Sequence, residues 1–197
     1  MTNHQLNIEN KIKIIHGWGK FNSYKSNIFY PKTMHELKHL INVTKNDFIV
    51  RGMGRSYGDS SINDNVISLE KMKKNIALDI ENKSVKCSSN ITYKELNKYL
   101  IQNNFFPIVT PGSQYVTIGG AVASDVHGKN HHVDGSFCEH IISLEVLNQN
   151  ANIIKCSNND NKSFFNATNG GMGLTGVILS VSFKTEFTLL SKNALFD

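Results

Sequence analysis

The chain has 197 residues, 40% of them hydrophobic, and a formal net charge of +5 at pH 7. This content supports one substantial core or two packed lobes, and the scattered lysines without a basic run disfavour nucleic-acid binding. No apolar run is long enough to span a membrane and no secretion signal is recognisable, so we expect a cytoplasmic protein. The three cysteines lie far apart in the sequence, and their spacing predicts neither a disulfide framework nor a zinc site.

The hydrophobic pattern predicts a mixture of strands and helices without strict βαβ order, which favours an α+β fold with local α/β character. Two of the helices begin with capping boxes, formed by Thr33 with Glu36 and by Thr92 with Glu95. In chain order we expect a helix over 33–46, strands over 47–52, 65–70, 75–80 and 83–88, a helix over 92–103, a strand over 105–113, a short helix over 117–128, a hairpin over 140–157, a short helix over 160–171 and a strand over 176–187.

The first functional candidate is the glycine-rich loop Gly52–Gly58, which follows a predicted strand. Its spacing, G-x-G-x-x-x-G, is neither a Rossmann fingerprint nor a P-loop. Glycines nevertheless allow successive backbone N–H groups to turn inward around a diphosphate. The two arginines of the chain, Arg51 and Arg55, both lie here, and a guanidinium can grip phosphate oxygens with two bonds. The alternative interpretation is a tight surface turn.

Two further glycine-rich stretches follow, at residues 111–132 and 169–178. In the first, Thr117 is placed to cap a helix whose first turn contains Gly119 and Gly120, so we expect free N–H groups and an anion or ligand site there. Close packing of that helix start against another element is the alternative. The second stretch leads from a turn into a strand, and it also fits a simple loop before the last core strand.

Four histidines, His127, His131, His132 and His140, fall close to Cys138. Their spacing matches no zinc motif and no carboxylate is placed beside them as a base, so we predict no metal site. His127 follows the predicted ligand-type helix directly, and we expect it to line a ligand pocket.

Together and in this order, the stretches RGMGRSYGD, PGSQYVTIGGAVASDVHGKNHH and GGMGLTGVI resemble the FAD-binding domain of the p-cresol methylhydroxylase and vanillyl-alcohol oxidase superfamily. Within it they look most like the decaprenylphosphoryl-ribose oxidases, and sugar-lactone oxidases are more distant. The resemblance implies an FAD-binding PCMH-type domain with two α/β lobes, one a small sheet and the other a larger, mostly antiparallel sheet flanked by helices. The implied divisions are an extension at 1–16, lobes at about 17–90 and 91–190, and a tail at 191–197.

The resemblance also implies roles for individual residues. The segment that would wrap the FAD pyrophosphate is Val50, Arg51, Gly52, Met53, Gly54, Arg55, Ser56, Tyr57, Gly58, Asp59 and Ser60. Those that would continue along the diphosphate and ribityl chain are Gly112, Thr117, Ile118, Gly119 and Gly120. Those that would approach the isoalloxazine are Ser124, Asp125, Val126 and His127, and Val177 would meet the adenine through its backbone. His127 and Lys129 would lie near the reactive face of the flavin and are the catalytic candidates.

The implied reaction is oxidation of a CH–OH group of a polyprenyl-phosphate pentose, with hydride transfer to flavin N5, as in cell-wall arabinose synthesis. Several superfamily members attach FAD through a histidine that follows the last loop glycine, and here that position is Asp59, so noncovalent FAD is expected. Family enzymes carry a substrate domain after this one, so a separate chain would supply it or the chain is a fragment. The alternatives are a non-catalytic flavin-binding subunit and an aldonolactone oxidase-type enzyme; no general base is assigned.

Overall fold

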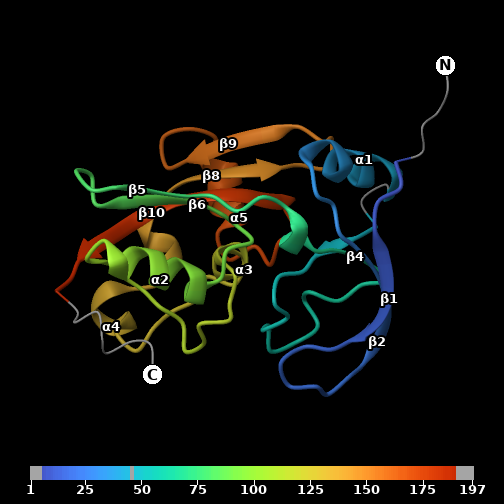
Figure 1. The fold of residues 1–197 in the computed structure, drawn as a ribbon, viewed down its shortest axis with the longest axis horizontal. Helices are drawn as coiled ribbons and strands as arrows, with labels where there is room; N and C mark the ends of the chain where they lie inside the picture. Colours follow the sequence, from blue (N-terminus) through green and yellow to red (C-terminus); the bar gives the residue numbers. More distant parts are fainter. Residues whose placement is uncertain (1–5, 45–46, 190–197) are drawn as a thin grey trace.

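The computed structural model describes residues 6–44 and 47–189, and these form two β-sheets with helices packed on them (Figure 1). The first sheet has the strand order β1-β2-β4-β3, in which β1 is antiparallel to β2 whereas β2 and β3 both run parallel to β4. Its strands are β1 (Asn10–Ile15), β2 (Tyr24–Phe29), β3 (Ile49–Val50) and β4 (Asn65–Ile67). Helix α1 (Met34–Thr44) connects β2 to the segment that enters β3.

The second sheet is antiparallel and has the order β5-β6-β10-β8-β9, and the short strand β7 pairs with the far end of β10. Its strands are β5 (Ile76–Asp79), β6 (Ser84–Ser88), β7 (Phe105–Pro107), β8 (Ile141–Leu147), β9 (Ile153–Ser157) and β10 (Val177–Phe187). The accompanying helices are η1 (Leu69–Lys71), α2 (Tyr93–Gln102), α3 (Ile118–Ala123), α4 (His131–Asp134), η2 (Phe137–His140) and α5 (Lys162–Thr168). This architecture confirms the predicted α+β class.

Most of the predicted elements are confirmed, and the capping boxes show why. Thr92 Oγ1 accepts from the backbone N–H of Glu95, while a carboxylate oxygen of Glu95 accepts from the N–H of Thr92, so α2 begins where the sequence indicates. At α1, Thr33 accepts from Glu36 N–H, but the Glu36 carboxylate accepts from Lys32 N–H instead of Thr33. The end of the helix predicted over 33–46 falls partly on residues 45–46, outside the described residues.

The N-terminal strands β1 and β2 were not predicted. Strand β1 lies at the edge of the first sheet, and its side chains are exposed except for Ile15. Its sequence does alternate lysine with isoleucine over residues 11–14, so a strand signal was present in the sequence and the prediction missed it. Strands β5 and β6 belong to the second sheet, so the two sheets divide the chain between Ile67 and Ile76. This division comes earlier than the lobe boundary near residue 90 that the resemblance implies.

A shared core joins the two sheets. Leu37, Leu40 and Ile41 of α1 pack in one buried cluster with Leu147 of β8 and Val177 of β10. A larger cluster lies between the second sheet and its helices and includes residues of α2, α3 and β10. Because α1 packs against residues from both sheets, the two lobes are held in a fixed relation by buried apolar contacts.

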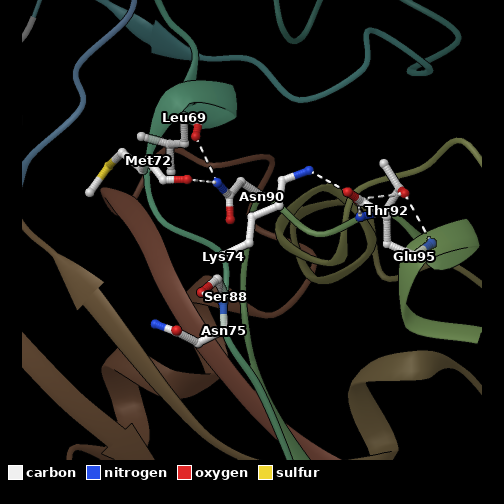
Figure 2. Close-up of polar contacts among 8 residues, drawn as sticks. All are labelled: Leu69, Met72, Lys74, Asn75, Ser88, Asn90, Thr92 and Glu95. Atoms are coloured by element: carbon white, nitrogen blue, oxygen red, sulfur yellow. Dashed lines mark hydrogen bonds and ion pairs between the residues drawn. The ribbon is translucent and has the colours of Figure 1, made fainter. Parts of the chain in front are cut away.

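The segment that crosses from one sheet to the other is fixed by polar contacts (Figure 2). Asn90 donates through Nδ2 to the carbonyl oxygens of Leu69 at 2.7 Å and Met72 at 3.0 Å, at the two ends of η1. Lys74 forms an ion pair with Glu95, with an N–O distance of 2.6 Å. These contacts tie the crossing segment to the start of α2. Among the described residues, no helix is long and apolar enough to cross a membrane.

Candidate functional site

The glycine-rich stretches meet in one cleft of about 1310 Å³. Its walls include residues from the loop 50–61, the loop 106–113, α3 with the segment after it at 116–131, and the turn before β10 at 172–178. The volume exceeds the range of roughly 300–1,000 Å³ of drug-sized ligand pockets, as an extended dinucleotide requires. The two sheets therefore bring together segments that are more than a hundred residues apart in the sequence.

The loop after β3 presents unused backbone donors to this cleft. No backbone N–H from Gly52 to Ser61 donates a hydrogen bond to any described part of the chain, although Arg51 N–H and Ile62 N–H on either side do. Because backbone N–H groups are normally paired, a run of open donors along a cleft wall is a ready site for an anion. The Cβ that a larger residue would carry at position 52 would collide with Thr117, so the loop lies directly against the start of α3.

The Arg51 side chain stabilises the loop through hydrogen bonds to backbone and side-chain oxygens of the protein. Its guanidinium donates to the carbonyl oxygen of His16 at 2.7 Å and to the carbonyl and hydroxyl oxygens of Ser61 at 3.2 and 3.0 Å. Burial, with a smaller contribution from the charge of Arg55, lowers the pKa of Arg51. These bonds join the two ends of the loop to the segment that follows β1. Arg51 thus lines the cleft, but both of its terminal nitrogens already donate to oxygens of the protein.

The expectation of free N–H groups at the start of α3 is wrong. Ile118 N–H donates to Ile91 O and Gly119 N–H donates to Ser89 O, both at 2.8 Å, and Gly120 N–H donates to Thr117 Oγ1 at 3.2 Å. The segment after β6 lies across the helix start and takes up the donors that an anion would need. Gly119 is required for this packing, because a Cβ there would approach the Cβ of Ser89 to 2.9 Å.

The third glycine-rich stretch docks onto the other end of α3. Gly170 N–H donates to Val122 O at 2.9 Å, and Met172 N–H donates to Ala123 O at 2.8 Å. Asp125, which has a positive φ of 41°, accepts from Cys138 N–H at 3.0 Å. Burial raises the pKa of the Cys138 thiol, and the Asp125 carboxylate adds to that shift. The thiol therefore stays protonated, and it does not line the cleft.

The histidine-containing segment forms the far wall of the cleft. His127 and His131 meet edge to face with ring centroids 5.2 Å apart, and His131 Nδ1 lies 3.2 Å from Gly128 O. His127 and Lys129 are both exposed along the cleft. Across residues 6–44 and 47–189, no three His, Cys, Asp or Glu side chains are grouped so as to hold a metal ion.

The structure brings most of the candidate residues to the cleft. Those that line it are Val50, Arg51, Gly52, Met53, Gly54, Arg55, Ser56, Tyr57, Gly58, Ser60, Gly112, Thr117, Gly119, Gly120, Ser124, Asp125, Val126, His127 and Lys129. Asp59, Ile118 and Val177 do not line it, although the neighbours of Val177 do. Ile118 and Val177 are fully buried in the core, whereas Asp59 is exposed.

Sequence reasoning missed several cleft residues. Trp18, Ser89, Asn90 and Glu186 also line the cleft. Trp18 N–H donates to Ser56 O at 2.8 Å, which brings the segment after β1 against the loop. No local motif marks these residues, because each reaches the cleft through sheet pairing or a loop contact. The pair Gly17–Gly19 was the one available signal: a Cβ at Gly17 would collide with Gly58 O.

Comparison with known proteins agrees with this geometry. Residues 26–157 match a family described as an FAD binding domain. Over 140 residues the chain is 36% identical to decaprenylphosphoryl-beta-D-ribose oxidase of Mycolicibacterium smegmatis, which covers 69% of this chain and 30% of that protein. It is 26% identical over 162 residues to L-gulonolactone oxidase of Bos taurus, covering 79% of this chain and 36% of that protein.

A third relative is D-arabinono-1,4-lactone oxidase of Candida albicans, 30% identical over 106 residues, covering 52% of this chain and 19% of that protein. The chain thus spans about a third or less of the length of these curated relatives. The family match covers well over half of the chain and includes the loop 50–61 and the wall 116–131 of the cleft. The chain belongs to the FAD binding domain family.

Proposed function

We propose that this chain binds FAD noncovalently as part of an oxidoreductase that acts on a CH–OH group of a sugar derivative. The carrying observation is the run of unpaired backbone N–H groups from Gly52 to Ser61 on the wall of a cleft of about 1310 Å³. A diphosphate places two negative charges where such donors are open, and glycines let it approach the backbone closely. The residues present therefore fit the group that the family implies.

The protein's own contribution to the reaction would be binding and orientation. FAD, when bound, supplies the redox chemistry by accepting a hydride from the substrate carbon. His127 and Lys129, exposed on the cleft wall, would orient the substrate oxygens and stabilise developing charge. His131 Nδ1 lies 3.2 Å from Gly128 O, which orients its ring beside His127.

Two features support noncovalent binding. The position after the last loop glycine is Asp59. In several members of the superfamily that the sequence resembles, a histidine at this position is bonded covalently to the flavin, and a carboxylate cannot form that bond. The Cys138 thiol, the cysteine nearest the cleft wall 123–131 in sequence, has a raised pKa and lies outside the cleft lining. A protonated, buried thiol is a poor nucleophile.

For the substrate, we propose a polyprenyl-phosphate pentose, and hence a role in cell-wall arabinose synthesis. The support is the higher identity to the ribose oxidase, 36% against 26% for the gulonolactone oxidase. An aldonolactone is the second candidate, because the lactone oxidase match covers the larger share of this chain, 79% against 69%. In either case a further substrate-binding region, on this or a separate chain, would complete the site.

The test of cofactor binding is the absorbance spectrum of the purified chain. We expect a yellow protein whose flavin passes into the supernatant after acid precipitation. A colourless protein that fails to bind added FAD refutes the proposal, and flavin that stays with the precipitate refutes the noncovalent part. Anaerobic bleaching by decaprenylphosphoryl ribose, compared with gulonolactone, then separates the two substrate classes in a preparation that contains the substrate-binding region.

A further inference from the structure

Arg55, the second of the two arginines, has different contacts from Arg51. The guanidinium carbon of Arg55 lies 5.0 Å from the ring centroid of Trp18 and 5.8 Å from that of Tyr115. Trp18 follows β1, whereas Tyr115 belongs to the loop before α3, so the cation contacts aromatic rings from two segments that are far apart in the sequence. Such contacts orient a guanidinium through the ring faces and leave its in-plane N–H groups free.

None of these N–H groups is used within the described part of the chain. Arg55 makes no hydrogen bond or ion pair there, and its Nε is buried without a partner. Arg51, four residues earlier, provides the internal comparison, because its guanidinium bonds to His16 and Ser61. A buried guanidinium nitrogen without an acceptor is costly, and an oxyanion is the ligand that matches the donor fork of arginine.

The local charge also favours an anion. The Nζ of Lys94 lies 5.9 Å from the Tyr115 ring centroid, so a second cation contacts the same ring as Arg55. Of the acidic residues that line the cleft, Asp125 accepts from Cys138 N–H, and neither Glu70 nor Glu186 is within ion-pair distance of Arg55. The positive charge at this end of the cleft is therefore not neutralised by the described residues.

We infer that Arg55, oriented by Trp18 and Tyr115, binds a phosphoryl oxyanion in the cleft through its in-plane N–H groups. This subsite is distinct from the backbone donors of the loop, and it rests on the proposed function for the identity of its ligand. Two sources carry the required group: the diphosphate of FAD and the phosphate of a glycosyl phosphate bound beside the cofactor. The same charge-assisted hydrogen bonds would recognise either one.

Calorimetric titration of Arg55→Met and Arg55→Lys tests the subsite, with Lys98→Met as the matched control. Lys98 is an exposed cation on α2 that does not line the cleft, so its loss removes the same charge elsewhere. The probes are inorganic pyrophosphate, FAD, riboflavin, and ribose 5-phosphate added to the FAD-loaded chain. Trp18, the single tryptophan, reports occupancy next to Arg55 by its fluorescence in the wild-type chain. Circular dichroism checks that each variant is folded.

If Arg55 binds the cofactor's phosphates, Arg55→Met weakens pyrophosphate and FAD by about tenfold or more while riboflavin is unaffected. If it binds the second phosphate, ribose 5-phosphate is weakened by that factor and FAD is not. Arg55→Lys should fall between wild type and Met, because it keeps the charge without the planar fork. Lys98→Met should match wild type.

The inference is overturned if all four affinities of Arg55→Met stay within about twofold of wild type, or if riboflavin weakens as much as FAD, since a charge-assisted phosphate bond predicts a larger and selective loss. Failure of the wild-type chain to bind any of the phosphorylated probes also overturns it. Arg55-dependent binding of pyrophosphate without any binding of FAD or riboflavin supports the subsite and refutes the proposed cofactor, so the two failures are distinguishable.

Discussion

Replacing Gly54 by alanine should destabilise the flavin-free protein, because Gly54 supports Arg51. Gly54 has a φ of +64°, and a Cβ at this position would lie 2.6 Å from Cζ of Arg51. The left-handed conformation costs a non-glycine residue roughly 1–2 kcal/mol. Moving the guanidinium would also break at least one of its bonds to His16 O and Ser61 O, and losing a hydrogen bond from a charged group costs about 1.5–3 kcal/mol. Together these effects predict a loss of roughly 2.5–5 kcal/mol in the free energy of unfolding.

Urea unfolding of the flavin-free chain measures this loss, with Gly58→Ala as the control in the same loop. A Cβ at Gly58 meets no atom within 4 Å, so we expect a change within about 0.5 kcal/mol. FAD affinity should also fall in Gly54→Ala, since the loop would no longer be held at both ends. The reasoning is refuted if Gly54→Ala unfolds at the wild-type urea concentration, or if Gly58→Ala is equally costly.

Two further predictions concern the scaffold of the cleft. Asn90→Ala should lower the free energy of unfolding by about 1–3 kcal/mol, because it leaves Met72 O without its donor and Leu69 O with the N–H of Met72 alone. Asn90→Asp should cost more, because a carboxylate would face two carbonyl oxygens. Equal midpoints in urea for all three proteins would contradict this. Burial raises the pKa of Cys87 to about 12, so its thiol should resist iodoacetamide at pH 8.5 until urea is added. The unfolded thiol ionises at about pH 8.5, so the contribution of Cys87 to the free energy of unfolding should be complete below that pH. As the pH rises from there toward 12, that contribution should fall by up to about 1.4 kcal/mol per pH unit. An identical alkaline slope of stability in Cys87→Ala would show that the thiol makes no such contribution.

Local structure was the part most open to prediction from sequence. The capping box of Thr92 and Glu95, the hairpin of β8 and β9, and the alternating pattern of β10 depend on residues that are close in the chain, and each forms as expected. Strand β1 was not predicted, although its alternating lysine and isoleucine residues are typical of a strand. Its position is decided by pairing with β2 and not by its own pattern.

The candidate site, like the fold, was predicted in part from local sequence and decided in part by tertiary contacts. The order and sequence of the three glycine-rich stretches predicted an FAD binding domain through their resemblance to a known family, whereas the residue chemistry alone indicated only a site suited to a diphosphate. Which donors stay open is decided by tertiary contacts. The segment at Ser89 and Ile91 closes the start of α3, while the loop from Gly52 to Ser61 is left unpaired. The two arginines are likewise equivalent in sequence, yet Arg51 is bound within the protein and Arg55 faces Trp18 and Tyr115, because only the packed fold places those partners beside them.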